Sequence, residues 1–289
     1  MIQQSRVIVT DKTALSLTTW GDASPSIVLI HGFADGRYIW TPFVPALAGY
    51  ASVLAMDLRG HGDSAWDAAG VYSMDKFVED AQHVIDQMCS GELVLIGHSL
   101  GAEIAIRLCV AYAGRVKGLV LVDGGPGLVS DGMVQMRSNF TTRPRDYASR
   151  QAYRQAMRDW MPLADEAMLD LAAQHAIAPI DEQFRLKSDP ALTSMPLPIG
   201  DAGLWPILES LPCDSLLIRG EGSAVLSRRT TTDMAQRLPS LRCETVSVAG
   251  HAVMMDNPAE FGALLEGFVA GIYDDANPSS TANAMVELA

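Results

Sequence analysis

Residues 93–108, LVLIGHSLGAEIAIRL, decide the fold of this chain. Four apolar residues typical of a buried strand run directly into the pattern G-x-S-x-G, and a helical stretch begins at Gly101. Glycines at 97 and 101 permit a very tight turn from strand to helix, because they carry no side chain that would clash there. The turn leaves Ser99 at a helix N-terminus, where backbone N–H groups favour negative charge. We therefore predict that Ser99 is a nucleophile and that the N–H of Leu100 faces the oxyanion formed by its attack.

Short apolar runs alternate with helical patterns on both sides of this motif. Alternation of this kind predicts βαβ units and a mostly parallel sheet of eight strands, with helices on both faces. The first two strands have no room for a helix between them, so we expect them to pair antiparallel at one edge. The predicted strands are 5–10, 15–20, 27–30, 52–56, 93–96, 117–122, 215–218 and 243–248, and the predicted helices are 38–48, 73–88, 101–113, 227–238 and 258–271.

The alternation stops after the sixth strand. Residues 125–204 contain helical segments but no strand-like run, which predicts a helical cap inserted between two strands. The rest then forms an α/β core of residues 1–124 and 205–273, while the small, polar and aperiodic residues 274–289 predict a disordered tail. Within the cap, Tyr153, Met157 and Trp160 recur at helical spacing, and an ordinary packing face is the favoured interpretation of these three residues.

The composition and net charge of the chain restrict the kinds of binding partner that we expect. Hydrophobic residues make up 48% of the 289, enough for a large core, and the net charge of −13 argues against nucleic acid. No apolar run is long enough to span a membrane, the N-terminal segment lacks the apolar run of a signal peptide, and the four cysteines form no CxxC pair. These features predict a cytoplasmic protein with free thiols, acting as a monomer or homodimer on a small molecule. No cluster has metal-ligand spacing, so no metal is predicted.

Two further segments bear on the chemistry. His251 follows the last predicted strand and therefore emerges at the same carboxyl edge of the sheet as Ser99, where it can act as general base. His31-Gly32-Phe33 follows the strand 27–30, so that the N–H of Phe33 becomes the second predicted oxyanion donor and His31 a structural residue. The ring of His98 is predicted to point away from the site.

These motifs together resemble the α/β-hydrolase superfamily. HGF at 31–33, DLRGHGDS at 57–64, GHSLG at 97–101 and GH at 250–251 occur in the order typical of that family. The resemblance implies a Ser–acid–His triad in that chain order and activity without a cofactor, and it makes residues 57–64 a structural turn. Within the family, LVLVDGGP at 119–126 and IRGEGSAVLS at 218–227 resemble hydrolases related to 2-(acetamidomethylene)succinate hydrolase and ring-cleavage product hydrolases.

The expected function is that of a serine hydrolase which cleaves an ester, amide, thioester or C–C bond of a small carbonyl substrate through an acyl-enzyme. The subgroup resemblance favours substrates that bear a carboxylate. Three alternatives use the same fold: a thioesterase or esterase of secondary metabolism, a cofactor-independent oxygenase, and a non-enzymatic ligand receptor.

The acid of the triad does not occupy its usual place in this sequence. In the family it usually follows the strand after the cap in a G-x-x-D pattern, but here that place reads Gly-Glu-Gly-Ser and ends on Ser223. Asp123 follows the strand 117–122, on the neighbour of the nucleophile's strand, and we predict that it is the acid. Glu221, two residues before the vacated position, is the alternative.

The predicted cap is also unusually basic for this chain. Residues 131–158 hold six arginines and two acids, in a chain whose net charge is −13. Arg150, Arg154 and Arg158 have the spacing of a solvated helix face. The remaining three, Arg137, Arg143 and Arg145, are candidates to bind a substrate carboxylate, because a guanidinium matches its bidentate geometry.

Overall fold

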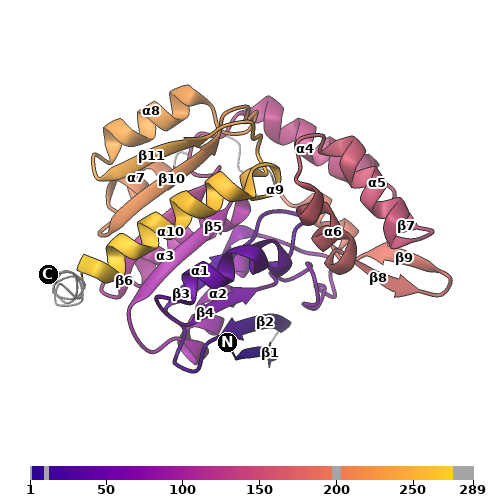
Figure 1. Ribbon diagram of the computed structural model, residues 1–289, viewed down its shortest axis with the longest axis horizontal. Coiled ribbons are helices and arrows are strands. Elements are labelled where there is room, and N and C mark those ends of the chain that lie inside the picture. Colours follow the sequence, from indigo (N-terminus) through magenta and orange to yellow (C-terminus); the bar gives the residue numbers. More distant parts are fainter. Residues whose placement is uncertain (1, 10–12, 197–202, 276–289) are drawn as a thin grey trace, which may run out of the picture.

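The centre of the molecule is one twisted sheet (Figure 1). A computed structural model describes residues 2–9, 13–196 and 203–275. The eight strands lie in the order β1-β2-β4-β3-β5-β6-β10-β11. β1 pairs antiparallel with β2 at the edge, as predicted, β2 pairs antiparallel with β4, and all other neighbours are parallel. The strands are β1 (Gln3–Val9), β2 (Ala14–Trp20), β3 (Ile27–Ile30), β4 (Val53–Met56), β5 (Leu93–His98), β6 (Val116–Val122), β10 (Asp214–Gly220) and β11 (Leu241–Val246).

Helices cover both faces of the sheet because its central strands are apolar on both sides. Val28 and Leu95 belong to the core on one face, whereas Ile27 and Ile96 belong to the core on the other. The first face is covered by α2 (Met74–Met88), α3 (Leu100–Ala111), α7 (Leu204–Glu209) and α8 (Arg228–Arg237). The second is covered by the 3-10 helix η1 (Arg37–Phe43), α1 (Val44–Leu47), α9 (Val253–Asp256) and α10 (Pro258–Asp275).

Strand order brings the predicted site residues to one edge. β5 lies between β3 and β6, and the register pairs Ile30 with Gly97 and His98 with Val122. The N–H of Ser99 donates to the carbonyl oxygen of Val122 at 3.0 Å, so the chain after β5 and the chain after β6 leave the sheet at the same level. The loops after these parallel strands therefore meet above the sheet.

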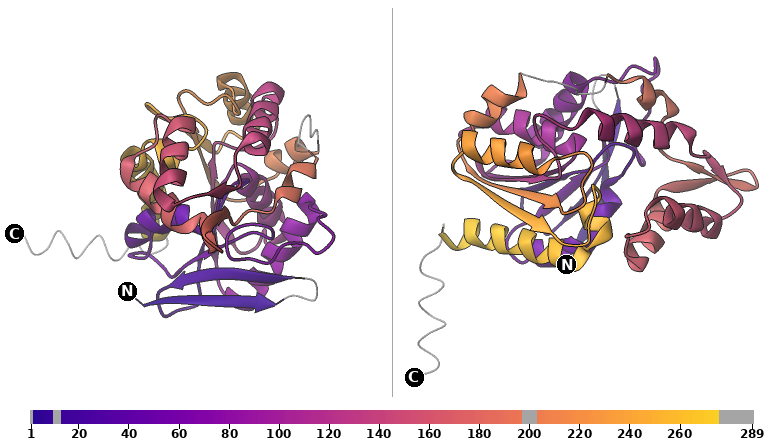
Figure 2. Two further views of the ribbon diagram at one scale, coloured as in Figure 1. Left: turned by 90° about the vertical axis from the view of Figure 1, so that its right-hand side faces the viewer. Right: turned by 90° about the horizontal axis from the view of Figure 1, so that it is seen from above.

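The segment between β6 and β10 is not wholly helical, and the prediction of helices alone is corrected here. It contains α4 (Ser130–Thr142), α5 (Arg150–Trp160), α6 (Glu166–His175) and the 3-10 helix η2 (Pro190–Ser194), but also a small sheet of β7 (Asp146–Tyr147), β9 (Gln183–Leu186) and β8 (Ile177–Ile180). β7 and β9 contain charged residues, and the apolar run of β8, IAPI, includes a proline, so the sequence does not mark these strands of two to four residues. Figure 2 shows this small sheet projecting beside α5 and α6.

The fold also bears on the predicted turn at 57–64, on the predicted tail and on the expected absence of a membrane-spanning segment. Asp57 of the predicted turn accepts hydrogen bonds from the backbone N–H groups of Arg37 and Asp63, at 2.7 and 2.9 Å, which agrees with a structural role. α10 runs to Asp275, and the remainder of the predicted tail lies outside the described residues. No helix in the described part of the chain is both long and apolar enough to cross a membrane.

Candidate active site

Ser99 occupies a strained turn between β5 and α3. Its φ of 52° and ψ of −113° are rarely adopted by a residue with a side chain. The turn is closed so tightly that a Cβ on Gly97 would overlap the carbonyl oxygen of Gly101, and a Cβ on Gly101 would overlap that of Ile30. Ser99 is 5% exposed and lines two cavities, so its hydroxyl faces the space where a substrate can bind.

His251 connects the serine to a carboxylate. Its Nε2 lies 2.9 Å from Oγ of Ser99, and its Nδ1 lies 2.7 Å from Oδ2 of Asp123. The residue follows β11 in a loop that Asp256 fastens by accepting the N–H of Gly250 at 2.8 Å. Three side chains separated widely in sequence thus form one hydrogen-bonded chain, in which the imidazole can take the serine's proton.

Asp123 is held by several donors at once. It is 0% exposed, and its φ of 43° marks a second strained residue at the end of a strand. Oδ1 accepts the N–H of Gly220 at 3.1 Å, while Oδ2 accepts the hydroxyl of Ser223 at 2.5 Å in addition to His251. A buried carboxylate needs such partners, and these three fix its orientation.

Glu221, the alternative acid, is not brought to the histidine. Its side chain is 53% exposed, and one carboxylate oxygen lies 3.4 Å from the N–H of Val248. The other lies 4.0 Å from the guanidinium of Arg228. Glu221 was a candidate because it lies two residues before Ser223, but the structure directs its side chain to the surface.

The two predicted oxyanion donors lie beside Ser99. Leu100 begins α3, so its N–H has no carbonyl partner within the helix, and both Leu100 and Phe33 line a cavity together with Ser99. His31 holds the loop of Phe33, since its Nδ1 lies 2.8 Å from the carbonyl oxygen of Gly32 and its Nε2 accepts the N–H of Leu58 at 3.0 Å. Burial lowers the pKa of His31 to about 4, so the ring stays neutral and can accept.

The larger of the two cavities carries charged and hydrogen-bonding side chains among apolar ones, and we call it the polar cavity. This polar cavity has a volume of about 350 Å³ and is lined by Ser99, His251 and several ionisable side chains. Members that carry charge or hydrogen-bonding groups are Asp35, Tyr38, His98, Arg143, Tyr153, Trp160 and Asp256.

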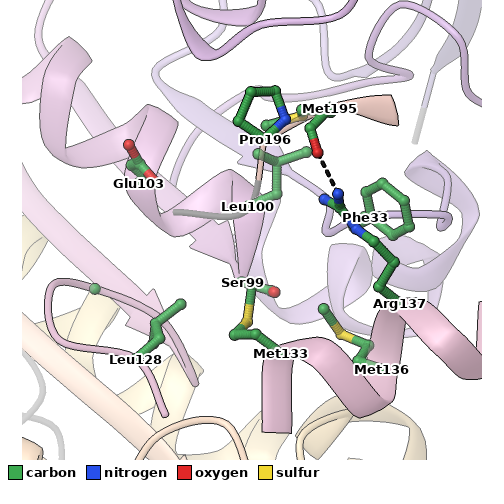
Figure 3. Close-up of a pocket in the computed structure, with 11 residues that line it drawn as sticks. Phe33, Ser99, Leu100, Glu103, Leu128, Met133, Met136, Arg137, Met195 and Pro196 are labelled. Atoms are coloured by element: carbon green, nitrogen blue, oxygen red, sulfur yellow. Dashed lines mark hydrogen bonds between the residues drawn. The ribbon is translucent and has the colours of Figure 1, made fainter. Parts of the chain in front are cut away.

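The smaller cavity also borders Ser99 and is mostly apolar (Figure 3). This apolar cavity has a volume of about 30 Å³. Its lining is mostly hydrocarbon and thioether: Phe33, Leu100, Leu128, Met133, Met136, Met195 and Pro196. Methionines fill irregular space adaptably, so the cavity suits a small apolar group.

The three candidate arginines have different surroundings. Arg143 lines the polar cavity, lies 4.4 Å above the ring of Trp160, and has an Nε that is buried without a hydrogen-bond partner among the described residues. Arg137 borders the apolar cavity, but its guanidinium donates to the carbonyl oxygens of Thr193 and Met195.

Arg145 lies away from both cavities. Its guanidinium donates to the carbonyl oxygens of Leu186, at 3.2 Å, and of Ser188, and so ties β7 to the end of β9. The expectation that Arg145 binds substrate is not supported, because Arg145 lines neither cavity and its Nη2 donates to backbone carbonyl oxygens. Residue spacing alone could not separate it from Arg143, two positions earlier.

Sequence reasoning missed Asp35. Its carboxyl lines the polar cavity, accepts the hydroxyl of Tyr38 at 3.3 Å and lies 3.9 Å from Nδ1 of His98. Burial raises the pKa of Asp35 to about 7, although the hydrogen bond from Tyr38 and the nearby charges of His251 and Arg143 oppose the change. Its position two residues after Phe33, in a loop already assigned to the site, was the available signal.

Two interpretations of packing residues are corrected. His98 does not point away from the site: its ring lines the polar cavity and its Nε2 lies 3.0 Å from the carbonyl oxygen of His251. Tyr153, Met157 and Trp160 also line the polar cavity, so they are more than a packing face. Their direction depends on how the inserted segment folds over the sheet, which helical spacing does not reveal.

A model of the Alpha/beta hydrolase family matches residues 27–264, and the chain therefore belongs to this family. Esterase Rv0045c of Mycobacterium tuberculosis is 30% identical over 276 residues, which cover 90% of this chain and 87% of that protein. The 2-(acetamidomethylene)succinate hydrolase of Mesorhizobium japonicum is 22% identical over 236 residues, covering 82% of this chain and 84% of that protein.

Solved structures agree with this placement. A crystal structure of E-2-(acetamidomethylene)succinate hydrolase superposes with a TM-score of 0.85 over 93% of this chain and 99% of that chain, at 21% identity. At this identity the likeness concerns the fold. Together these findings confirm the predicted fold and the family resemblance, and they define a hydrolytic enzyme as the class of protein.

Proposed function

We propose that this chain is a serine hydrolase in which Ser99, His251 and Asp123 form the catalytic triad. The observation that carries the proposal is the continuous chain of contacts, 2.9 Å from Oγ of Ser99 to Nε2 and 2.7 Å from Nδ1 to Asp123. A strained serine at a helix N-terminus, with a histidine on its hydroxyl and a buried carboxylate behind the histidine, is the arrangement that acyl transfer needs.

The proposed reaction has two halves. Oγ of Ser99 forms a bond to the carbonyl carbon while its proton passes to Nε2 of His251, and the oxyanion accepts the N–H groups of Phe33 and Leu100. Collapse breaks the bond to the leaving group, which takes the proton from Nε2. Water then attacks the acyl-enzyme with His251 as base and releases the acid. Asp123 keeps the imidazole in the required tautomer and stabilises its cation.

The position of His251 indicates which cavity holds the leaving group and which holds the acyl group of the substrate. Because Nε2 protonates the leaving group, that group has to lie on the side of His251, which lines the polar cavity but is not part of the described lining of the apolar cavity. The acyl group then enters the apolar cavity, whose volume of about 30 Å³ suits a short chain. The substrate is therefore a small carbonyl compound with a short apolar acyl group and a polar leaving group.

The position of Arg143 indicates which chemical group the leaving group carries. Arg143 lines the polar cavity, its Nε has no hydrogen-bond partner among the described residues, and a carboxylate on the leaving group would supply an acceptor for its guanidinium. A carboxylate-bearing substrate was also the expectation from sequence, and a relative is named as a hydrolase of a succinate derivative. A cytoplasmic location and a monomer or homodimer are kept as expectations alongside this proposal.

Ser99→Ala tests the mechanism. The variant should fold, lose labelling by a fluorophosphonate probe, and hydrolyse acetate esters roughly 10³-fold or more slowly, because triad members act as a unit. Wild-type turnover by folded Ser99→Ala protein would refute the proposal, because ester hydrolysis would then not depend on Ser99.

Arg143→Gln tests the substrate class. We expect KM for the acetate ester of 3-hydroxybenzoate to rise by about tenfold or more, the effect of losing one charge-assisted contact, with KM for its uncharged methyl ester unchanged. Arg158→Gln is the matched control, since Arg158 lines neither cavity and pairs with Glu166. A larger effect on phenyl hydrogen succinate, whose carboxylate is on the acyl side, would reverse the cavity assignment.

A further inference from the structure

We propose that Ser223 is a positioning residue for Asp123, and that position 223 remains a working alternative place for the triad acid. The inference rests on the proposed function, since it assumes that Asp123 serves His251. It concerns the turn after β10, residues 220–226, at the position where the sequence leads one to expect an acid and where the chain has a serine.

The hydrogen bonds of Ser223 determine the direction of its proton. Oγ accepts the backbone N–H of Val225 at 3.2 Å and of Leu226 at 3.0 Å. A hydroxyl has two lone pairs and one proton, so both acceptor sites are used and the proton has to point elsewhere. It is donated to Oδ2 of Asp123 at 2.5 Å, the same oxygen that receives Nδ1 of His251.

Hydrogen bonds from Arg219 hold the turn that carries Ser223. Arg219, 4% exposed, donates from Nε to the carbonyl oxygen of Leu226 at 2.7 Å, and from its two other nitrogens to those of Glu221 and Ser223 at 3.1 and 3.3 Å. One guanidinium thus fixes three carbonyl groups of the turn. The hydroxyl is consequently presented to Asp123 by a rigid support, as positioning requires.

The same geometry makes positions 123 and 223 interchangeable. Only two hydrogen-bond lengths, 2.5 Å and 2.7 Å, separate Oγ of Ser223 from Nδ1 of His251, with Oδ2 of Asp123 between them. An aspartate side chain extends one bond further than a serine. An aspartate at 223 would therefore reach the histidine if a serine at 123 vacated the space and returned the hydroxyl hydrogen bond.

The experiment compares Ser223→Ala, Asp123→Ser and the exchanged double variant Asp123→Ser/Ser223→Asp, measured as kcat and KM on an acetate ester. Ser223→Ala should lower kcat by about tenfold with KM within twofold, because an oriented charge-assisted contact is lost while the cavities are untouched. Asp123→Ser should lower kcat by about 10³-fold or more. The double variant should recover at least about a hundredfold of that loss, because the carboxylate again faces Nδ1.

Ser227→Ala is the matched control. Ser227 also accepts a backbone N–H, that of Thr230 at 2.9 Å, but it caps α8 and does not touch the triad. It should alter thermal stability with no change in kcat. Such a contrast separates positioning of the acid from simple loss of a turn contact.

The outcomes separate this inference from the proposed function. An active Asp123→Ser variant would refute the triad assignment itself. An inactive Asp123→Ser variant, together with a folded double variant that remains as inactive, would overturn the exchange. If circular dichroism shows that the double variant does not fold, Ser223→Ala decides: unchanged kcat refutes positioning, and loss of kcat at constant KM supports it.

Discussion

Asp123→Asn is the substitution whose effect can be worked out most fully. Three donors converge on the carboxylate: the N–H of Gly220 on Oδ1, and the hydroxyl of Ser223 and Nδ1 of His251 on Oδ2. An amide offers one oxygen and one NH₂ group, so one donor has to face another in either orientation. With NH₂ toward His251, the ring is driven into the tautomer that cannot accept the serine's proton. With NH₂ toward Gly220, a buried N–H loses its acceptor.

The substitution should lower both kcat and the free energy of unfolding. Loss of the correct tautomer and of the charge should lower kcat by about 10³- to 10⁴-fold, which is about 4–5.5 kcal/mol at 1.36 kcal/mol per tenfold. The unsatisfied buried donor should cost about 1–3 kcal/mol of folding free energy. At this chain length each kcal/mol lowers Tm by roughly 2–4 °C.

The assay is hydrolysis of an acetate ester at saturating substrate, with thermal unfolding measured in parallel. Glu221→Gln is the matched control, because its side chain is 53% exposed and the substitution leaves the triad intact. Its kcat should stay within twofold. A large loss in Glu221→Gln, together with near-normal turnover by Asp123→Asn, would refute the assignment of the acid.

Three further predictions concern stability. Asp35→Asn should gain stability relative to the natural chain as the pH rises from about 4 to 7. Burial raises the pKa of Asp35 to about 7, so in this range its carboxyl ionises in the unfolded chain while it stays protonated in the folded chain; a difference constant with pH in urea unfolding would contradict this. Burial lowers the pKa values of His31, His61 and His98 to about 4, 3 and 3, so below pH 6.5 the unfolded chain binds protons that the folded chain excludes. Acidification from pH 6.5 toward 4 should therefore lower the free energy of unfolding, and a chain that became more stable would refute it. Gly101→Ala should lower folding stability by roughly 3 kcal/mol or more, because its Cβ would overlap backbone carbonyl oxygens; a normal Tm would show that the turn can relax.

Much of the site follows from the sequence because its residues lie at strand ends. An apolar strand, a G-x-S-x-G turn and a helix within residues 93–108 give Ser99 its position, since each depends only on near neighbours in the chain. Parallel strands send their carboxyl ends to one edge, and for this reason the sequence predicts Asp123 and His251 beside Ser99. Because a serine, which cannot serve as the acid, occupies position 223, the sequence left two candidates for the acid, Asp123 and Glu221.

The tertiary structure decided matters that depend on direction. Whether Arg143 or Arg145 faces the cavity depends on how the segment between β6 and β10 crosses the sheet, which residue spacing does not specify. The choice of Asp123 over Glu221 at the histidine, and the donation from Ser223, result from contacts across about a hundred residues. Sequence spacing specifies where a strand ends, whereas the direction of a side chain beyond that end is set by the packing of distant segments around it.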